Sequence, residues 1–259
     1  MARKIVITSG KGGAGKTTVT ANLGYHLAKK GLRTVVLDCD LGLNNLDVLT
    51  GVENLVNFDL IDVINGRCRA KQALIESPLA ANLFVLPSAH TMSETEVSGQ
   101  RIRAAIEAIN LNFDFILIDC PAGIDVGFHR AVSVADEALL VVNPVITSIR
   151  DADKVSSLLK SYKIPVSAVV NRIRGDLVLS GESFSAEDIG NTLCLSVLSV
   201  IPEDDAVLSG IADLPSSAPY KAFSMLAASV NGEKYKIYNY LKKYSGFFGS
   251  IRRDIRKKL

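Results

Sequence analysis

The sequence predicts an α/β fold in which a doubly wound, mostly parallel sheet is covered by helices on both faces. Short runs rich in β-branched residues alternate with amphipathic stretches long enough for helices along the whole chain. Several runs, such as residues 139–142, are apolar without alternation, which is typical of strands buried on both faces of a sheet. A glycine-rich turn separates the first run from the amphipathic stretch that follows it.

Seven segments of the chain are predicted to be strands. They are residues 4–8, 33–38, 82–86, 113–119, 137–143, 166–171 and 194–201. In a parallel sheet of this kind, ligands bind at the edge where the carboxyl ends of the strands meet. Because no repeat or break in composition indicates a second unit, we expect residues 1–245 to form one domain and residues 246–259 a separate tail.

Composition and charge exclude several classes of protein. With 48% hydrophobic and 22% charged residues, the chain can build an ordinary core. No apolar run reaches the roughly 18 residues that a membrane-spanning helix needs. The formal net charge is +2, but residues 247–259 hold five basic residues against one acidic residue, which leaves the rest of the chain at −2. A body with that charge offers no general attraction to nucleic acid.

The four cysteines show neither a C-x-x-C pair nor the spacing of zinc ligands. We therefore expect isolated, buried thiols in a reducing cytosol. The basic N-terminus precedes an apolar run that is too short for a signal peptide. The cysteines are Cys39, Cys68, Cys120 and Cys194.

The glycine-rich turn carries the most specific motif of the sequence. It fits the pattern G-x-x-x-x-G-K-[ST], and it lies between a predicted strand and a predicted helix, as that motif requires. Glycines let backbone N–H groups point at phosphate oxygens, and the start of the helix adds the positive end of its dipole. We expect Lys16 to hold the β- and γ-phosphates and the Thr17 hydroxyl to bind Mg²⁺. The motif reads Gly10-Lys11-Gly12-Gly13-Ala14-Gly15-Lys16-Thr17.

The same turn also satisfies the dinucleotide pattern G-x-G-x-x-G, with Asp38 available to bind a ribose. Two observations favour a nucleoside triphosphate instead. Lys16 and Thr17 have no task in binding NAD, whereas a phosphate loop requires both. Asp119 also ends a predicted strand, at the place where a Walker B carboxylate is expected.

A second lysine, Lys11, and a second threonine, Thr18, give the loop a further feature. The arrangement Lys11-Gly-Gly-Ala-Gly-Lys-Thr-Thr18 resembles the deviant Walker A motif of the MinD/ParA family. The resemblance implies a dimeric ATPase in which Lys11 reaches the phosphates of the ATP bound by the other subunit. A cation placed there would stabilise charge that develops during hydrolysis, as an arginine finger does.

Three aspartates lie at the ends of predicted strands: Asp38 and Asp119 are the last residues of two strands, and Asp40 lies two residues beyond Asp38. They could be simple loop acids, but a triphosphate site gives them a role. By resemblance to the family, Asp40 activates or orients the attacking water, Asp38 supports the Mg²⁺ shell, and Asp119 contacts Mg²⁺ through water. Mg²⁺ keeps several of its waters in proteins, so such indirect contact is chemically reasonable.

The nucleotide base is expected at the ends of the last two predicted strands. The N-K-x-D motif of many GTP-binding proteins is absent, because the strand ends in Asn171-Arg172-Ile-Arg without an aspartate. The Asn171 amide can both donate to and accept from adenine, which favours ATP over GTP. By resemblance, Pro202, Glu203 and Asp204 close over the base.

The tail has the pattern of an amphipathic helix. At about 100° per residue, its apolar side chains fall within about 120° of one another, and arginines flank them. This favours a helix that lies on an anionic membrane surface, where two tails on a dimer would hold better than one. A terminal helix docked on its own core, or a nucleic-acid contact, are the alternatives. The apolar residues are Phe247, Phe248, Ile251, Ile255 and Leu259.

Further segments resemble the MinD branch of the family. They are residues 38–47, 118–124, 149–154 and 170–174, and with the loop and the tail they span nearly the whole chain. The resemblance implies placement of the division septum by a protein on the inner face of the cell membrane. It also implies two partners, a MinC-type division inhibitor and a topological factor. Asp151 and Asp153 either lie on the partner surface or cap the start of a helix.

Three other functions remain as alternatives. ParA-type partition ATPases usually have Asp-Pro-Gln after the second strand, whereas Leu41 and Gly42 follow Asp40 here. Flagellar-number regulators share the fold but usually carry an extra N-terminal segment. A metabolic P-loop phosphotransferase, which belongs to a different class, would need a substrate pocket and fast turnover without any partner.

Overall fold

The computed structural model describes all residues except 41–44, 89–96, 208–209, 235, 247–248 and 251–259. Its core is one eight-stranded sheet with the strand order β3-β4-β2-β5-β1-β6-β7-β8. All neighbouring strands are parallel except β3, which runs antiparallel to β4 at the edge. The strands are β1 (Arg3–Thr8), β2 (Thr34–Asp38), β3 (Ile75–Glu76), β4 (Leu83–Leu86), β5 (Phe115–Asp119), β6 (Glu137–Val142), β7 (Val166–Ile173) and β8 (Ser196–Pro202).

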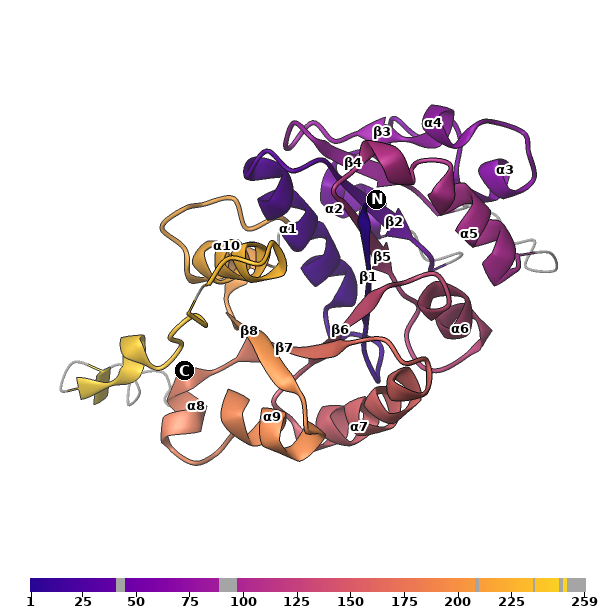
Figure 1. Ribbon diagram of the computed structural model, residues 1–259. Helices are drawn as coiled ribbons and strands as arrows, with labels where there is room; N and C mark the ends of the chain where they lie inside the picture. The colour runs from indigo at the N-terminus through magenta and orange to yellow at the C-terminus, as the bar shows by residue number, and fades with distance from the viewer. Residues whose placement is uncertain (41–44, 89–96, 208–209, 235, 247–248, 251–259) are drawn as a thin grey trace.

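Helices cover both faces of this sheet, as Figure 1 shows. The described helices and 3-10 turns are α1 (Lys16–Lys29), α2 (Leu46–Thr50), α3 (Leu60–Ile64), α4 (Ala70–Ala73), α5 (Gly99–Glu107), η2 (Asn110–Asn112), α6 (Val126–Val132), α7 (Ile146–Ser161), α8 (Gly175–Leu179), α9 (Ala186–Leu193), η3 (Asp205–Val207), α10 (Ala218–Val230) and η4 (Lys242–Tyr244). The predicted doubly wound α/β fold is therefore confirmed.

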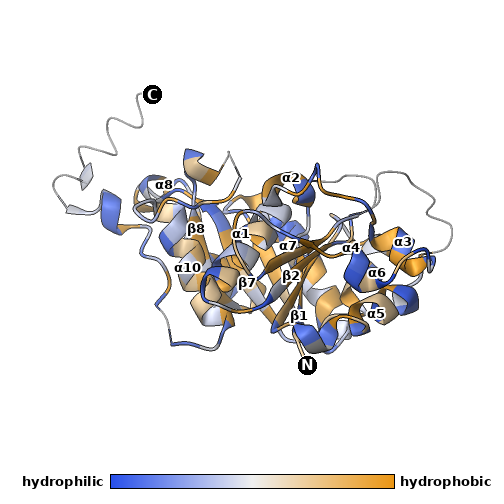
Figure 2. Cartoon of the chain, turned by 90° about the horizontal axis from the view of Figure 1, so that it is seen from above, coloured by the Kyte–Doolittle hydropathy of each residue, from blue (hydrophilic) through white to orange (hydrophobic). Residues whose placement is uncertain are grey.

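The sheet separates two hydrophobic cores. One lies under α1, α2 and α10, and the other under α3, α5, α6, α7 and α9. Successive strand residues point to opposite faces, so Val6 belongs to the second core while Ile5 and Ile7 belong to the first. Figure 2 shows the result, with apolar strands between helices that turn hydrophilic residues outward. Burial on both faces explains why the strands read as apolar runs.

All seven predicted strands are present, and each differs from its prediction by no more than two residues at either end. The structure adds β3, a two-residue edge strand that no sequence pattern indicated. Helix α1 begins at Lys16, directly after the glycine-rich turn, as predicted. The predicted tail helix, with Phe247, Phe248, Ile251, Ile255 and Leu259, lies outside the described residues. No helix in the described part of the chain is long and apolar enough to cross a membrane.

Candidate functional site

The glycine-rich loop connects the carboxyl end of β1 to the start of α1, in the middle of the sheet. Gly13 and Gly15 have φ angles of 77° and 95°, a left-handed conformation that glycine adopts without a steric penalty. The Ser9 hydroxyl donates to the carbonyl of Lys11 at 2.8 Å and braces the turn. Lys16 is buried at the first position of α1, whereas Lys11 is exposed.

Contacts from three neighbouring elements hold the loop in place. A Cβ atom on Gly10 would lie 2.4 Å from the carbonyl carbon of Asp151, so the loop touches the backbone of α7. At the end of β7, the side-chain amide of Asn171 donates to the carbonyl of Ala14 at 2.9 Å. At the end of β6, Asn143 donates to the same carbonyl at 3.1 Å in the amide orientation that satisfies both of its polar atoms. These contacts therefore fix the position of the loop relative to β6, β7 and α7.

Two buried carboxylates face each other beside the loop. Asp38 and Asp119 end the neighbouring strands β2 and β5 and are paired in register, with exposed fractions of 2% and 1%. Burial and the charge of Asp119 raise the pKa of Asp38 well above its usual value. Burial raises the pKa of Asp119 to about 6, although hydrogen bonds from Thr17 and Thr20 and the charge of Lys16 act to lower it. Such a pair is costly without a cation nearby.

Asp40 is placed differently from these two. It is half-buried, its backbone N–H donates to Asp38 at 2.8 Å, and it lines a cavity of about 560 Å³. The opposite wall of that cavity includes Ala122 and Asp125 from the loop after β5. Burial raises the pKa of Asp40, while the charge of Lys16 lowers it. This carboxylate therefore has solvent-sized space beside it.

The residues present fit a magnesium ion that shares its coordination with phosphates. Asp38 and Asp119 form a buried acidic pair, and Thr17 hydrogen-bonds to Asp119. Among the described residues, no group of three or more His, Cys, Asp or Glu side chains could form a metal cage. Mg²⁺ typically binds through one or two protein carboxylates together with waters and substrate phosphates, so the donor set suits it.

The residues predicted to surround the base come together at the ends of β7 and β8, where Ile173 pairs with Pro202. Arg172 is exposed with a left-handed φ of 57°. Asp204 accepts from the backbone N–H of Ala206 at 3.1 Å, and Glu203 is exposed. Their contact with a base stays a prediction. The contact of Asn171 with the base also stays a prediction, since its amide nitrogen donates a hydrogen bond to the carbonyl of Ala14.

Sequence reasoning missed two residues of this site. Asn143 ends an apolar strand with a polar side chain, which is the signal that singled out Asp38 and Asp119. Thr20 lies one helical turn after Thr17, and its hydroxyl donates to Asp119 at 3.2 Å. Its role could have been predicted from helical spacing once the Walker B carboxylate was placed.

Two other expectations need correction. Helix α7 begins at Ile146, so Asp151 and Asp153 lie within it and the helix-cap interpretation is wrong. Asp151 is half-buried and pairs with Lys154 at 3.7 Å, while Asp153 is exposed.

The cysteines are all free, but the expectation of four buried thiols is only partly correct. Cys39 and Cys120 are buried, Cys68 is half-buried and Cys194 is exposed. Cys194 adopts a left-handed conformation just after α9, where the chain turns toward β8, so its side chain remains at the surface.

Comparisons with known proteins agree with this geometry. The sequence profile of the AAA domain matches residues 2–166. The septum site-determining protein MinD of Bacillus subtilis is 38% identical, with 97% of each chain covered. A putative MinD of Guillardia theta is 40% identical over 95% of this chain and 94% of its own. The chain belongs to the MinD family.

Solved structures of this family have the same fold. The Aquifex aeolicus MinC:MinD complex matches with a TM-score of 0.86 and 38% identity, covering 92% of this chain and 99% of the other. MinD of Pyrococcus horikoshii with Mg-ADP matches with a TM-score of 0.80 and 34% identity, covering 89% and 96%. A ParA family ATPase from Chlorobium tepidum shares the fold at 22% identity. This MinD-family chain is a septum-positioning ATPase.

Proposed function

We propose that this chain is an ATP-gated dimer that docks on the inner face of the cell membrane and recruits a division inhibitor of the MinC type. The observation that carries the proposal is the contrast between the two loop lysines. Lys16 is buried beside Asp119, whereas Lys11 is exposed at the rim of the loop. A cation left at the rim is available to a second subunit, where it would act on the phosphates of that subunit's ATP.

Exposed apolar side chains near the loop support pairing of two subunits through this edge. Ile124 and Val126 follow β5, and Val145 and Ile146 begin α7; all four are between 51% and 65% exposed. A Cβ on Gly12 would lie 3.9 Å from Ala122, and Gly10 touches α7, so both segments are close to the loop. Burying this patch between two copies would add hydrophobic stabilisation to the contacts made by ATP.

For hydrolysis, we assign to Asp40 the role of activating or orienting the attacking water. The cavity beside Asp40 gives a water room to approach, and Lys16 helps to keep the carboxylate charged. Asp38, Asp119 and Thr17 would hold Mg²⁺, which supplies charge neutralisation at the phosphates when bound. Because Lys11 comes from the other subunit, a lone chain would hydrolyse slowly, and a topological partner that tightens the dimer would stimulate it.

The tail converts dimerisation into membrane binding. One short amphipathic helix with basic residues holds weakly, and each basic residue near an anionic surface contributes roughly 1 kcal/mol. Two tails on one dimer gain from effective concentration. ATP would then decide whether the protein is at the membrane or in the cytoplasm. The MinC:MinD complex of Aquifex aeolicus supports an inhibitor of the MinC type as the partner.

Co-sedimentation with anionic liposomes, or with random duplex DNA, in the presence of ATP, ADP or no nucleotide tests this proposal. The wild type should sediment with liposomes only with ATP. Lys16→Ala should lose nucleotide binding, Lys11→Ala should bind ATP but remain monomeric, and Asp40→Ala should form a long-lived ATP dimer on liposomes. Deleting residues 247–259 should remove liposome binding while leaving nucleotide binding intact. Salt-sensitive binding to DNA, or a monomer with bound Mg-ATP, would contradict the proposal.

A further inference from the structure

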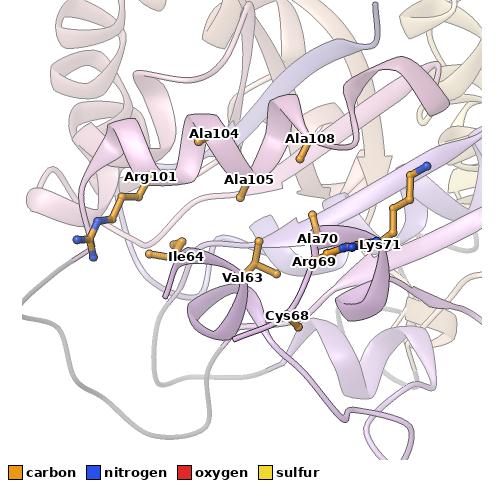
Figure 3. Close-up of a pocket in the computed structure, with 10 residues that line it drawn as sticks. All are labelled: Val63, Ile64, Cys68, Arg69, Ala70, Lys71, Arg101, Ala104, Ala105 and Ala108. Atoms are coloured by element: carbon orange, nitrogen blue, oxygen red, sulfur yellow. The ribbon is translucent and has the colours of Figure 1, made fainter. Parts of the chain in front are cut away.

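A groove on the flank of the molecule has no part in the ATPase site. It lies between α3 and α4 on one side and α5 on the other, and its volume is about 580 Å³ (Figure 3). Ligand sites in proteins occupy roughly 300–1,000 Å³, so the groove is large enough for a specific partner. None of its lining residues belongs to the glycine-rich loop or to the strand ends beside it.

The middle of the groove is apolar and shallow. Val63 and Ile64 of α3 are half-buried along one wall. Ala104 of α5 and Ala108, the residue that directly follows α5, are exposed along the other wall, about one helical turn apart. Alanine side chains leave space for another helix to approach closely, since the side chains at the contact set the distance between packed helices.

The two ends of the groove are cationic. Figure 3 shows Arg101 at one end and Arg69 and Lys71 at the other, with the apolar residues between them. All three cations are exposed. Burial and the charges of Asp62 and Asp59 raise the pKa of Cys68, so this lining residue is an uncharged thiol.

We propose that this groove binds an acidic amphipathic helix of a partner protein. Its apolar face would lie on Ala104 and Ala108, and its carboxylates would reach Lys71 at one end and Arg101 at the other. A lipid carries its charge in one headgroup, whereas these cations are separated by an apolar floor. A helix with carboxylates on both sides of an apolar stripe matches that order of charges.

The groove lies at the opposite edge of the sheet from the described C-terminal segment. The groove elements α3 and α4 lie beside β4 and β3, at one end of the strand order. The segment before the tail packs on α8, beside β7 and β8 at the other end, where a Cβ on Gly175 would meet the carbonyl of Tyr240 (Figure 1). A partner in the groove would therefore leave that segment uncovered.

A selection from a phage-displayed library of peptides of about 15 residues, roughly four helical turns, tests the proposal on the full-length protein. The enriched sequences should have apolar residues at helical spacing with Asp or Glu beside them. The double substitution Lys71→Glu and Arg101→Glu should weaken the selected peptide about tenfold or more in fluorescence anisotropy. Lys221→Glu is the matched control, because it changes an exposed lysine of α10 on the other face of the sheet.

A second variant tests the apolar floor without changing charge. Ala104→Gln replaces an exposed alanine of a helix, so the fold is retained, but the longer side chain should block the peptide. A selection that yields no binder dependent on these residues would overturn the proposal. So would enriched sequences without acidic residues. If the double substitution instead weakens binding to phosphatidylglycerol vesicles and leaves peptide binding unchanged, the groove binds lipid headgroups and the proposal is wrong.

Discussion

Gly10 touches the backbone of α7 with no space for a side chain. A Cβ atom there would lie 2.4 Å from the carbonyl carbon of Asp151 and 2.7 Å from the nitrogen of Ala152. Gly10→Ala must therefore move either the loop or the helix. We expect a loss of about 2–3 kcal/mol in the free energy of unfolding, as for other overpacked sites. Thermal unfolding without nucleotide measures it.

Gly12→Ala is the control for this prediction. The nearest atom to a Cβ on Gly12 is the Cβ of Ala122 at 3.9 Å, which is an ordinary contact, and the residue has no left-handed φ. Its melting temperature should stay close to that of the wild type. Equal losses in the two variants would mean that the contact with α7 does not decide the cost.

His26 should make the stability of the chain depend on pH. Its ring packs against Tyr25, Tyr220 and Phe223, and its Nε2 has no hydrogen-bond partner within the described part of the chain. Burial lowers its pKa from 6.5 to about 4, an effect that a hydrogen bond with the backbone of Ala212 partly offsets. As the pH falls, the unfolded chain therefore binds a proton at His26 before the folded chain does. The contribution of the neutral His26 to the free energy of unfolding is complete above pH 6.5 and is lost as the pH falls toward 4.

The loss associated with His26 should be about 3 kcal/mol at the acid end. Asp119 acts in the opposite direction, because its raised pKa of about 6 favours the folded state as the pH falls. The effect of His26 must therefore be measured as a difference in the free energy of unfolding between the wild type and a variant that lacks this histidine. Urea unfolding of the wild type and of His26→Leu at pH 7 and pH 5 should show that the variant loses less stability on acidification. A parallel loss in both proteins would exclude His26 as the cause.

At the scale of elements, apolar pattern predicted the strands well because burial on both faces leaves an unbroken hydrophobic run. It failed for β3, which has only the two residues Ile75 and Glu76 and whose pairing with β4 depends on the surrounding fold. The alternative in which Asp151 or Asp153 caps a helix was wrong for another reason, because α7 begins at Ile146 and no side chain caps it at Val145. Boundaries of this kind are decided by tertiary contacts.

The candidate site likewise contains features that local sequence patterns predict and features that depend on the tertiary fold. The loop and the three aspartates were predictable because local motifs and strand ends mark them. The hydrogen bond from Asn171 to Ala14 joins residues 157 positions apart, and that from Thr20 to Asp119 joins residues 99 apart. Such contacts follow from strand order, which no local pattern in one sequence reveals. The chemical groups of the site could therefore be predicted from the sequence, but the hydrogen bonds that hold them in place could not.

The link between the ATPase domain and the tail is an element-scale contact that can be tested. Tyr244 is buried, and the Tyr240 hydroxyl accepts from the backbone N–H of Ala186 at 3.2 Å. Gly175 has no room for a Cβ, which would lie 2.3 Å from the Tyr240 carbonyl. Gly175→Ala should release this segment, so that trypsin cuts faster at the exposed Lys242 and Lys243.

Nucleotide affinity is the control for this variant, because Gly175 lies outside the loop. We expect it to change by less than about twofold, since the phosphates bind at the loop and the substitution affects the contact between Gly175 and Tyr240. Unchanged proteolysis together with a lower melting temperature would mean that the segment stays docked and that the cost falls on α8 itself.

For the whole molecule, the question is which surface a second copy covers. The exposed apolar side chains of Ile124, Val126, Val145 and Ile146 lie on the edge that carries the loop, and Lys11 is exposed on the same edge. A surface of this kind is costly in water but stabilising in an interface. A dimer that closes over the nucleotide would bury it, and the ATP dependence of pairing would follow from the shared phosphates.

Val126→Glu with Ile146→Glu should abolish that dimer without unfolding the monomer. Both residues are more than 60% exposed, so the free energy of unfolding should change by less than about 0.5 kcal/mol per site. In the dimer, two buried carboxylates per subunit without partners should weaken association by about 100-fold or more, measured by light scattering with Mg-ATP. Leu79→Glu is the control. Leu79 is 43% exposed and precedes β4, so it lies near the amino ends of the parallel strands, whereas the loop lies at their carboxyl ends. If the double variant still pairs while the control does not, the dimer forms through the other edge, and Lys11 cannot reach a second nucleotide.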